Sequence, residues 1–202
     1  MNINYKITLH SYWHCGSGLA AGAQADSLVI KDKNGLPYIP GKTIKGLIRD
    51  AVDELLSFDG ITEPDEAYQK VFGYFGDDKK DNDKKDENEK EKEKVAIKSE
   101  AFFSNATLNE TESKAITEHN LQQFMFKNIA STSIEENGIA KDHSLRTTQV
   151  TVPCTLEGEI IDVPDGMKET IENAMKFIKQ LGSGRTRGLG RCTFELKERS
   201  DA

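Results

Sequence analysis

A stretch running from Asp26 to Arg49 holds the residues of this chain that are best suited to phosphate chemistry. It begins with a carboxylate, and near its middle Pro40–Gly41 leads into the start of an expected helix. Lys42 and Lys45 follow, so that with Arg49 three basic residues lie three and four apart and share one helical face. The first N–H groups of a helix lack intrahelical partners, so a helix start beside basic side chains is suited to bind an anion.

The charge of the chain is unevenly distributed. A net charge of −7 ordinarily argues against a nucleic-acid partner. However, residues 27–49 carry five basic residues against one acidic residue, and residues 181–191 carry three arginines and no acidic residue. Residues 50–66, in contrast, carry seven acidic residues and no basic one. An acidic protein with such local basic strips can bind a phosphate chain through them, with weak nonspecific affinity.

The sequence contains partial matches to two nucleotide-binding motifs, but neither match is complete. Gly41-Lys42-Thr43 ends like a Walker A motif, yet Leu36 stands where the first glycine of that motif belongs. Pro37 and Pro40 also lack the N–H donors that such a loop offers to phosphate. The glycine cluster of residues 16–22 misses the G-x-G-x-x-G spacing by one residue. The sequence therefore argues against both a P-loop and a Rossmann site.

The elements that must position these residues alternate between strands and helices. Patterns rich in β-branched residues predict strands over residues 3–13, 28–31, 95–108, 147–161 and 191–196. Apolar residues three and four apart predict helices over residues 43–57, 65–72 and 164–181, the last one closed by Gly182. We further expect a glycine-rich loop over residues 15–22 and a turn at Asn34–Gly35. The order β-α-…-β-β-α-β indicates an α+β, ferredoxin-like sheet with inserted loops.

A chain of 202 residues usually forms one domain, so we expect a single domain over residues 1–202. Residues 77–94 contain nine acidic residues, seven lysines and no apolar residue. Such a tract buries too little surface to offset the entropy cost of ordering it, which predicts a disordered charged insertion.

The absence of certain sequence patterns leads to expectations about the cellular compartment, the cysteines and zinc binding. No run of 18 apolar residues and no signal peptide is present, so we expect a cytoplasmic protein with no membrane partner. Its three cysteines, Cys15, Cys154 and Cys192, are far apart and odd in number, which favours reduced thiols over disulfides. No Cys-x-x-Cys or Cys-x-x-His spacing suggests a zinc site.

Three segments resemble one known family. Residues 22–50, GAQADSLVIKDKNGLPYIPGKTIKGLIRD, are similar to the signature of the repeat-associated mysterious proteins (RAMPs) of CRISPR systems. Within that family they most resemble the backbone subunit of type III effector complexes. The loop Gly182–Gly190, GSGRTRGLG, resembles the C-terminal glycine-rich loop of the superfamily. Residues 139–150 resemble the region before its thumb hairpin returns to the sheet.

The resemblance implies an RNA-recognition-like palm with a thumb-like region near residues 130–148. It also implies a subunit stacked in several copies along a guide CRISPR RNA, together with other subunits and a target RNA. RNA held by its backbone requires cationic side chains and N–H groups. The residues expected to bind RNA are Lys42, Thr43, Lys45, Arg49, Gly184, Arg185, Arg187, His143 and Arg146.

The resemblance assigns catalysis to Asp26. In members that cleave RNA, an aspartate at this motif position lies beside the scissile phosphate of the target and is needed for metal-dependent cleavage. One carboxylate does not build a full site, so RNA oxygens would complete the coordination of a divalent metal, Mg²⁺ or Mn²⁺. The chain departs from the family pattern at two positions, with Leu28 in place of proline and Lys42 in place of serine.

Two further functions remain open. The first is a catalytically inactive scaffold that binds RNA within the same complex, in which Asp26 only caps a turn. The second is a stand-alone endoribonuclease that processes precursor CRISPR RNA, with His10 or His14 as general base. A structural role as a partly buried histidine is the favoured interpretation of His14.

Overall fold

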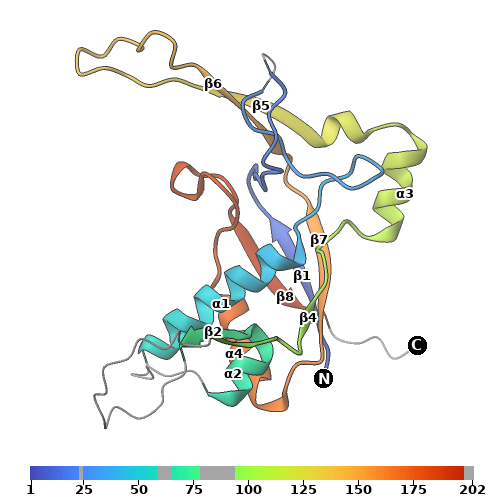
Figure 1. The fold of residues 1–202 in the computed structure, drawn as a ribbon. Coiled ribbons are helices and arrows are strands. Elements are labelled where there is room, and N and C mark those ends of the chain that lie inside the picture. Colours follow the sequence, from blue (N-terminus) through green and yellow to red (C-terminus); the bar gives the residue numbers. More distant parts are fainter. Residues whose placement is uncertain (23–24, 59–64, 78–93, 198–202) are drawn as a thin grey trace.

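A four-stranded antiparallel sheet forms the centre of the protein in the computed structural model, which describes residues 1–22, 25–58, 65–77 and 94–197. Its strands are β1 (Ile3–Leu9), β4 (Phe102–Phe103), β7 (Thr155–Ile161) and β8 (Cys192–Leu196), in the order β4-β7-β1-β8 (Figure 1). Alternate side chains of β1 are buried, namely those of Ile3, Tyr5, Ile7 and Leu9. This is the pattern of a strand with one face on the core.

Two helices, α1 (Gly41–Phe58) and α4 (Lys168–Phe177), pack side by side against this sheet. α1 buries Ile44, Ile48 and Val52, about one per turn, because these residues are spaced by four. The order β1-α1-β4-β7-α4-β8, with β1 and β7 in the middle of the sheet, is the ferredoxin-like arrangement. The predicted α+β, ferredoxin-like fold is therefore confirmed.

A second, smaller unit follows α1. Helix α2 (Glu66–Phe72) begins after Asp65, whose Oδ1 accepts a hydrogen bond from the Tyr68 N–H (2.7 Å), and it ends at Gly73, as the sequence predicts. Strands β2 (Tyr74–Asp77) and β3 (Lys94–Ile97) then pair as a separate two-stranded sheet. The predicted charged insertion of residues 77–94 falls largely outside the described residues.

A long hairpin extends away from the central sheet (Figure 1). Its strands are β5 (Phe126–Ser131) and β6 (Arg146–Thr151), preceded by helix α3 (Glu110–Glu118) and a 3-10 turn, η1 (Gln122–Met125). This β5–β6 hairpin coincides with the thumb-like region expected near residues 130–148. Its action as a thumb stays a prediction, as does the single domain over residues 1–202.

The predicted strand over residues 147–161 is wrong in one respect, because it is two strands in two sheets. β6 ends at Thr151, whose N–H donates to the Trp13 carbonyl oxygen (2.8 Å), and β7 begins only at Thr155 in the central sheet. Pro153, which has no N–H to donate, lies in the break. The alternation of apolar residues continues through Val152, so the pattern does not reveal the break.

Several other helices and strands begin or end at residues that differ from the predicted ones. The helix over residues 164–181 begins as a 3-10 turn, η2 (Asp165–Met167), and α4 ends at Phe177, so Gly182 does not close it. The reason is a pairing that competes with the helix: Leu181 N–H donates to Gly190, and Cys192 N–H donates to Lys179 (both 2.9 Å). The strand over residues 95–108 is divided between β3, β4 and isolated bridges, residues 28–31 form only isolated bridges, and the first strand stops at Leu9.

Candidate functional site

Asp26 lies beside the β5–β6 hairpin, where it is hydrogen-bonded to Thr147 near the start of β6. Its N–H donates to the Thr147 carbonyl oxygen (2.8 Å), and its carboxylate Oδ2 accepts from the Thr147 N–H (2.6 Å). The carbonyl oxygen of the next residue, Ser27, accepts from the Gln149 N–H (2.9 Å). Asp26 is nevertheless exposed, so its carboxylate retains lone pairs for a further ligand. The loop carboxylate is thus fixed in direction and open to solvent.

His14 lies behind this loop and is buried, with 3% of its surface exposed. Its Nδ1 lies 2.6 Å from the Gln149 carbonyl oxygen, and its Nε2 lies 3.1 Å from the Ser27 Oγ. The imidazole therefore links the Asp26 loop to β6. Burial agrees with the structural role favoured for His14 and removes it from a surface where it would stack on RNA.

The C-terminal glycine-rich loop, Gly182–Gly190, packs on the same region. Ser183 N–H donates to the His14 carbonyl oxygen (2.9 Å), and Gly190 N–H donates to the Tyr12 carbonyl oxygen (2.8 Å). A β-carbon at Gly182 would overlap the His14 carbonyl oxygen, and its φ of 80° favours glycine as well. The two glycine-rich loops, at opposite ends of the sequence, are therefore neighbours.

The hairpin and the C-terminal glycine-rich loop together line a hollow of about 690 Å³, here called the arginine hollow. Arg146 comes from β6, and Arg187 comes from the 3-10 turn η3 (Arg185–Arg187). Most of the other lining residues carry hydroxyl groups: Ser131, Thr132, Ser133 and Ser144, with Ile134. Guanidinium and hydroxyl groups are good donors to phosphate oxygens. Two residues predicted to bind RNA thus meet here from distant segments.

Other predicted residues lie elsewhere. Arg185 lines a separate hollow of about 430 Å³, together with Asp50 and Glu54 of α1. His143 is exposed in the connection between β5 and β6, with a left-handed φ of 57°. Gly184 also has a left-handed φ, 74°, and precedes η3. The predicted RNA-binding set is therefore not one continuous surface.

The start of α1 is packed against the edge of the central sheet. Gly41 N–H donates to the Asn105 Oδ1 (2.9 Å), and Thr43 N–H donates to the Pro40 carbonyl oxygen (2.9 Å). These donors are occupied, which reduces what the helix start can offer to an anion through its backbone. The side chain of Lys42, which is exposed, is the better candidate.

Lys42 and Thr43 lie beside the first glycine-rich loop. Burial raises the pKa of the Cys15 thiol, while its hydrogen bond with Thr43 and the charge of Lys42 act in the opposite direction. These relations place both residues next to Cys15, the first residue of that loop.

Lys45 and Arg49 continue the basic face toward α2. The Lys45 Nζ lies 5.9 Å from the centroid of the Phe103 ring, and burial, followed by the charge of Arg49, lowers the Lys45 pKa. Arg49 lies near the phenol of Tyr68 in α2 and 3.9 Å from the Asp50 carboxylate. Lys45 and Arg49 therefore extend away from Lys42 along the helix.

A divalent metal would find one hard oxygen ligand at this site, the Asp26 carboxylate. Within the described residues, no group of three or more His, Cys, Asp or Glu side chains could hold a metal ion. A divalent metal held by Asp26 would therefore need ligands from outside the protein, and its binding stays a prediction. Among the same residues, no helix is long and apolar enough to cross a membrane.

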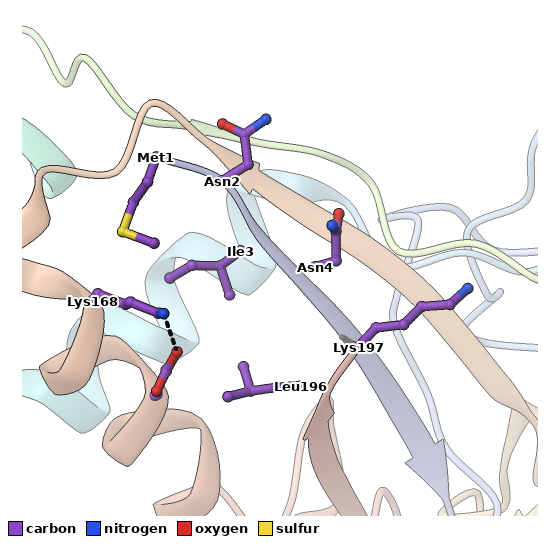
Figure 2. Close-up of a pocket in the computed structure, with 8 residues that line it drawn as sticks. Met1, Asn2, Ile3, Asn4, Lys168, Leu196 and Lys197 are labelled. Atoms are coloured by element: carbon purple, nitrogen blue, oxygen red, sulfur yellow. Dashed lines mark ion pairs between the residues drawn. The ribbon is translucent and has the colours of Figure 1, made fainter. Parts of the chain in front are cut away.

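A third hollow, of about 550 Å³, lies at the start of β1, the opposite end of that strand from the residues that lead to His14 (Figure 2). Its charged lining includes Lys197 and an ion pair between Lys168 and Glu172 of α4 (3.8 Å). None of the residues predicted to bind RNA lines this hollow.

Comparisons with known proteins agree with the resemblance seen in the sequence. The model of the RAMP superfamily matches residues 6–193. One similar solved structure is described as the Type III-B Cmr-beta bound to cognate target RNA, with 10% identity, a TM-score of 0.62 and coverage of 97% of each chain. Another is the apo state of Type III-B Cmr-beta, with 10% identity, a TM-score of 0.66 and coverage of 98% of each chain. No curated protein matches the sequence.

Proposed function

The chain belongs to the RAMP superfamily, and from that membership we propose that it is a backbone subunit of a cytoplasmic type III CRISPR effector complex. In this proposal it binds a guide CRISPR RNA, stacks with further copies of itself and other subunits, and cleaves complementary target RNA at Asp26. The fold shared with chains of Type III-B Cmr-beta structures, one of them bound to target RNA, supports the assignment.

The placement of Asp26 is the observation that carries the catalytic part. The exposed carboxylate accepts one hydrogen bond from the Thr147 N–H, and the Asp26 N–H donates a second one to the Thr147 carbonyl oxygen, so both the side chain and its backbone are held in direction. Fixed geometry is what a group needs to act on one phosphodiester bond of a bound strand. The neighbouring β5–β6 hairpin is the part of the protein expected to contact the RNA duplex.

Phosphate binding is proposed for three of the basic side chains near this loop. Lys42 is exposed at the start of α1, and Arg146 and Arg187 both line the arginine hollow. Lys45 and Arg49 would contact a strand that continues along α1. Because these contacts go to phosphate groups, binding should be nearly independent of base sequence and should weaken with salt.

In the proposed reaction, the main role of the protein is to orient the ribose 2′-hydroxyl next to the scissile phosphate. The Asp26 carboxylate accepts a hydrogen bond from the ribose 2′-hydroxyl beside the scissile phosphate and aims its oxygen for in-line attack. The new bond from the 2′-oxygen to phosphorus replaces the bond to the 5′-oxygen. The 2′-hydroxyl proton passes to the Asp26 carboxylate, and the leaving 5′-oxygen takes up a proton from water. A divalent metal held by Asp26 and RNA oxygens would supply charge neutralisation at the phosphate.

The test is cleavage of target RNA by assembled complexes that carry Asp26→Asn. The amide keeps an oxygen that can accept from Thr147 but removes the charge, so cleavage should fall about 100-fold or more while target binding is unchanged. Asp32→Asn is the matched control, because Asp32 belongs to the same motif but accepts from the Asn34 and Leu36 N–H groups in a turn. Equal cleavage by Asp26→Asn and wild-type complexes would refute the catalytic role.

The inactive scaffold is the second candidate, and the lone carboxylate favours it. A chain that relies on RNA for most metal ligands can lose cleavage and keep RNA binding. The stand-alone nuclease is less well supported, because both ring nitrogens of His14 are engaged and the His10 Nε2 lies 2.8 Å from the Thr193 Oγ1.

A further inference from the structure

We infer that His14 is a positioning residue for Asp26 and acts through the hydroxyl group of Ser27. The inference rests on the proposed cleavage at Asp26. It begins from a buried imidazole that the proposed chemistry does not use, although this imidazole lies beside the loop that carries the carboxylate.

The hydrogen bonds of His14 define the role of each ring nitrogen. A carbonyl oxygen can only accept, so the Nδ1 that lies 2.6 Å from the Gln149 carbonyl oxygen must carry a proton. In the neutral ring, Nε2 is then the acceptor, and the Ser27 hydroxyl at 3.1 Å is the donor. The chain of donation therefore runs from Ser27 through His14 to the backbone of β6.

The backbone of His14 is held from a third direction. The His14 carbonyl oxygen accepts from the Ser183 N–H, and Gly182 packs closely on that carbonyl. Gly16, in the first glycine-rich loop, lies so close to Nε2 that an added β-carbon would stand 3.1 Å away. His14 is thus the point where the Asp26 loop, β6 and both glycine-rich loops meet.

The bond between His14 and Ser27 complements the bonds made by Asp26 itself. The Asp26 bonds to Thr147 lie on an exposed part of the hairpin, where water can compete for the same groups. The imidazole is shielded from water, so its bond is better protected and fixes the residue next to the carboxylate. Without the Ser27 hydroxyl, the residue next to Asp26 would lose its bond to the buried imidazole, whereas the backbone bonds of this loop to β6 and to the first glycine-rich loop would remain.

The first experiment compares Ser27→Thr with Ser27→Val in assembled complexes. Threonine and valine have nearly the same shape, but only threonine keeps the hydroxyl. We expect Ser27→Thr to cleave target RNA almost as wild type, and Ser27→Val to lose about tenfold or more in cleavage rate with unchanged affinity for target RNA. Equal rates for the two variants would overturn the inference, provided that Asp26→Asn abolishes cleavage.

A second readout does not depend on activity. In the purified full-length chain, amide hydrogen exchange at Thr147, whose N–H is bound by the Asp26 carboxylate, should be faster in Ser27→Val than in Ser27→Thr. Amides of β1 serve as the internal reference for a general loss of stability. Nitrogen NMR of His14 should also show the neutral ring protonated at Nδ1. Equal Thr147 exchange in the two variants, or the opposite tautomer, would contradict the role of His14 even if Asp26 is catalytic.

Discussion

Gly41 shows at the scale of one residue how the motif is attached to the fold. The glycine is buried at the start of α1, where a β-carbon would overlap the carbonyl oxygen of Phe103 in β4. Its N–H is bound by the side chain of Asn105. The absence of a side chain therefore lets the helix start approach the sheet edge and sets the position from which Lys42 projects.

Gly41→Ala should destabilise the protein, because the methyl group has no free space against the backbone of β4. Overpacking of this kind costs about 1–3 kcal/mol, and each kcal/mol lowers the Tm of a chain of this size by roughly 2–4 °C. Gly46→Ala is the matched control, since Gly46 lies in the same helix with no atom within 4 Å of an added β-carbon. That variant should gain about 0.5–1 kcal/mol. Thermal unfolding of both variants measures the difference, and an equal Tm would contradict the close packing of Gly41.

At the scale of elements, the hairpin and the C-terminal glycine-rich loop build one site from two distant segments. Neither Arg146 nor Arg187 has an acidic partner among the ion pairs of the described residues. Their charges therefore remain available for a phosphate group in the arginine hollow.

Arg146→Ala and Arg187→Ala should each weaken RNA binding by the assembled complex at low salt. Loss of one phosphate contact should reduce the slope of log K against log salt by about 1 and act equally on unrelated sequences. Lys168→Ala is the control, because this basic residue lines the separate hollow at the start of β1, away from the arginine hollow. Binding titrations at several salt concentrations test the expectation. If Lys168→Ala reduced the slope as much as the arginine variants, the arginine hollow would have no special role.

How far the sequence predicts these elements depends on the range of the interactions that form them. The Asn34–Gly35 turn and the start of α2 follow from local hydrogen bonds with Asp32 and Asp65, so they were predictable. The end of α4 at Phe177 was not, because residues beyond it pair with a segment near Gly190. The cluster of His14, Ser27 and Gln149 was also unpredictable, since no local pattern brings residues 135 positions apart together.

At the scale of the whole molecule, one core joins the sheet to its helices and also encloses two of the three thiols. Burial raises the pKa of Cys154 to about 12 and that of Cys192 to about 11, and it raises the Cys15 pKa as well. The thiols of Cys154 and Cys192 therefore remain protonated in the folded protein at pH 8.5, whereas an unfolded chain has cysteines with a pKa near about 8.5.

Cys154 and Cys192 of the native protein should consequently resist alkylation by iodoacetamide at pH 8.5, because the thiolate is the reactive form. In concentrated urea all three cysteines should react, and mass spectrometry counts the labels. Rapid labelling of Cys154 or Cys192 without denaturant would show that the core opens more readily than its burial implies.

The pairing of Asp26 with Thr147 has a mechanical consequence. Because the carboxylate is bonded to β6, it would move with the hairpin if a bound strand tilted the hairpin against the central sheet. The distance between carboxylate and hairpin would then stay constant while both shifted relative to the helices. The cutting position along an RNA strand would be measured from the hairpin, so copies stacked in a row would cut at intervals equal to the spacing of their hairpins.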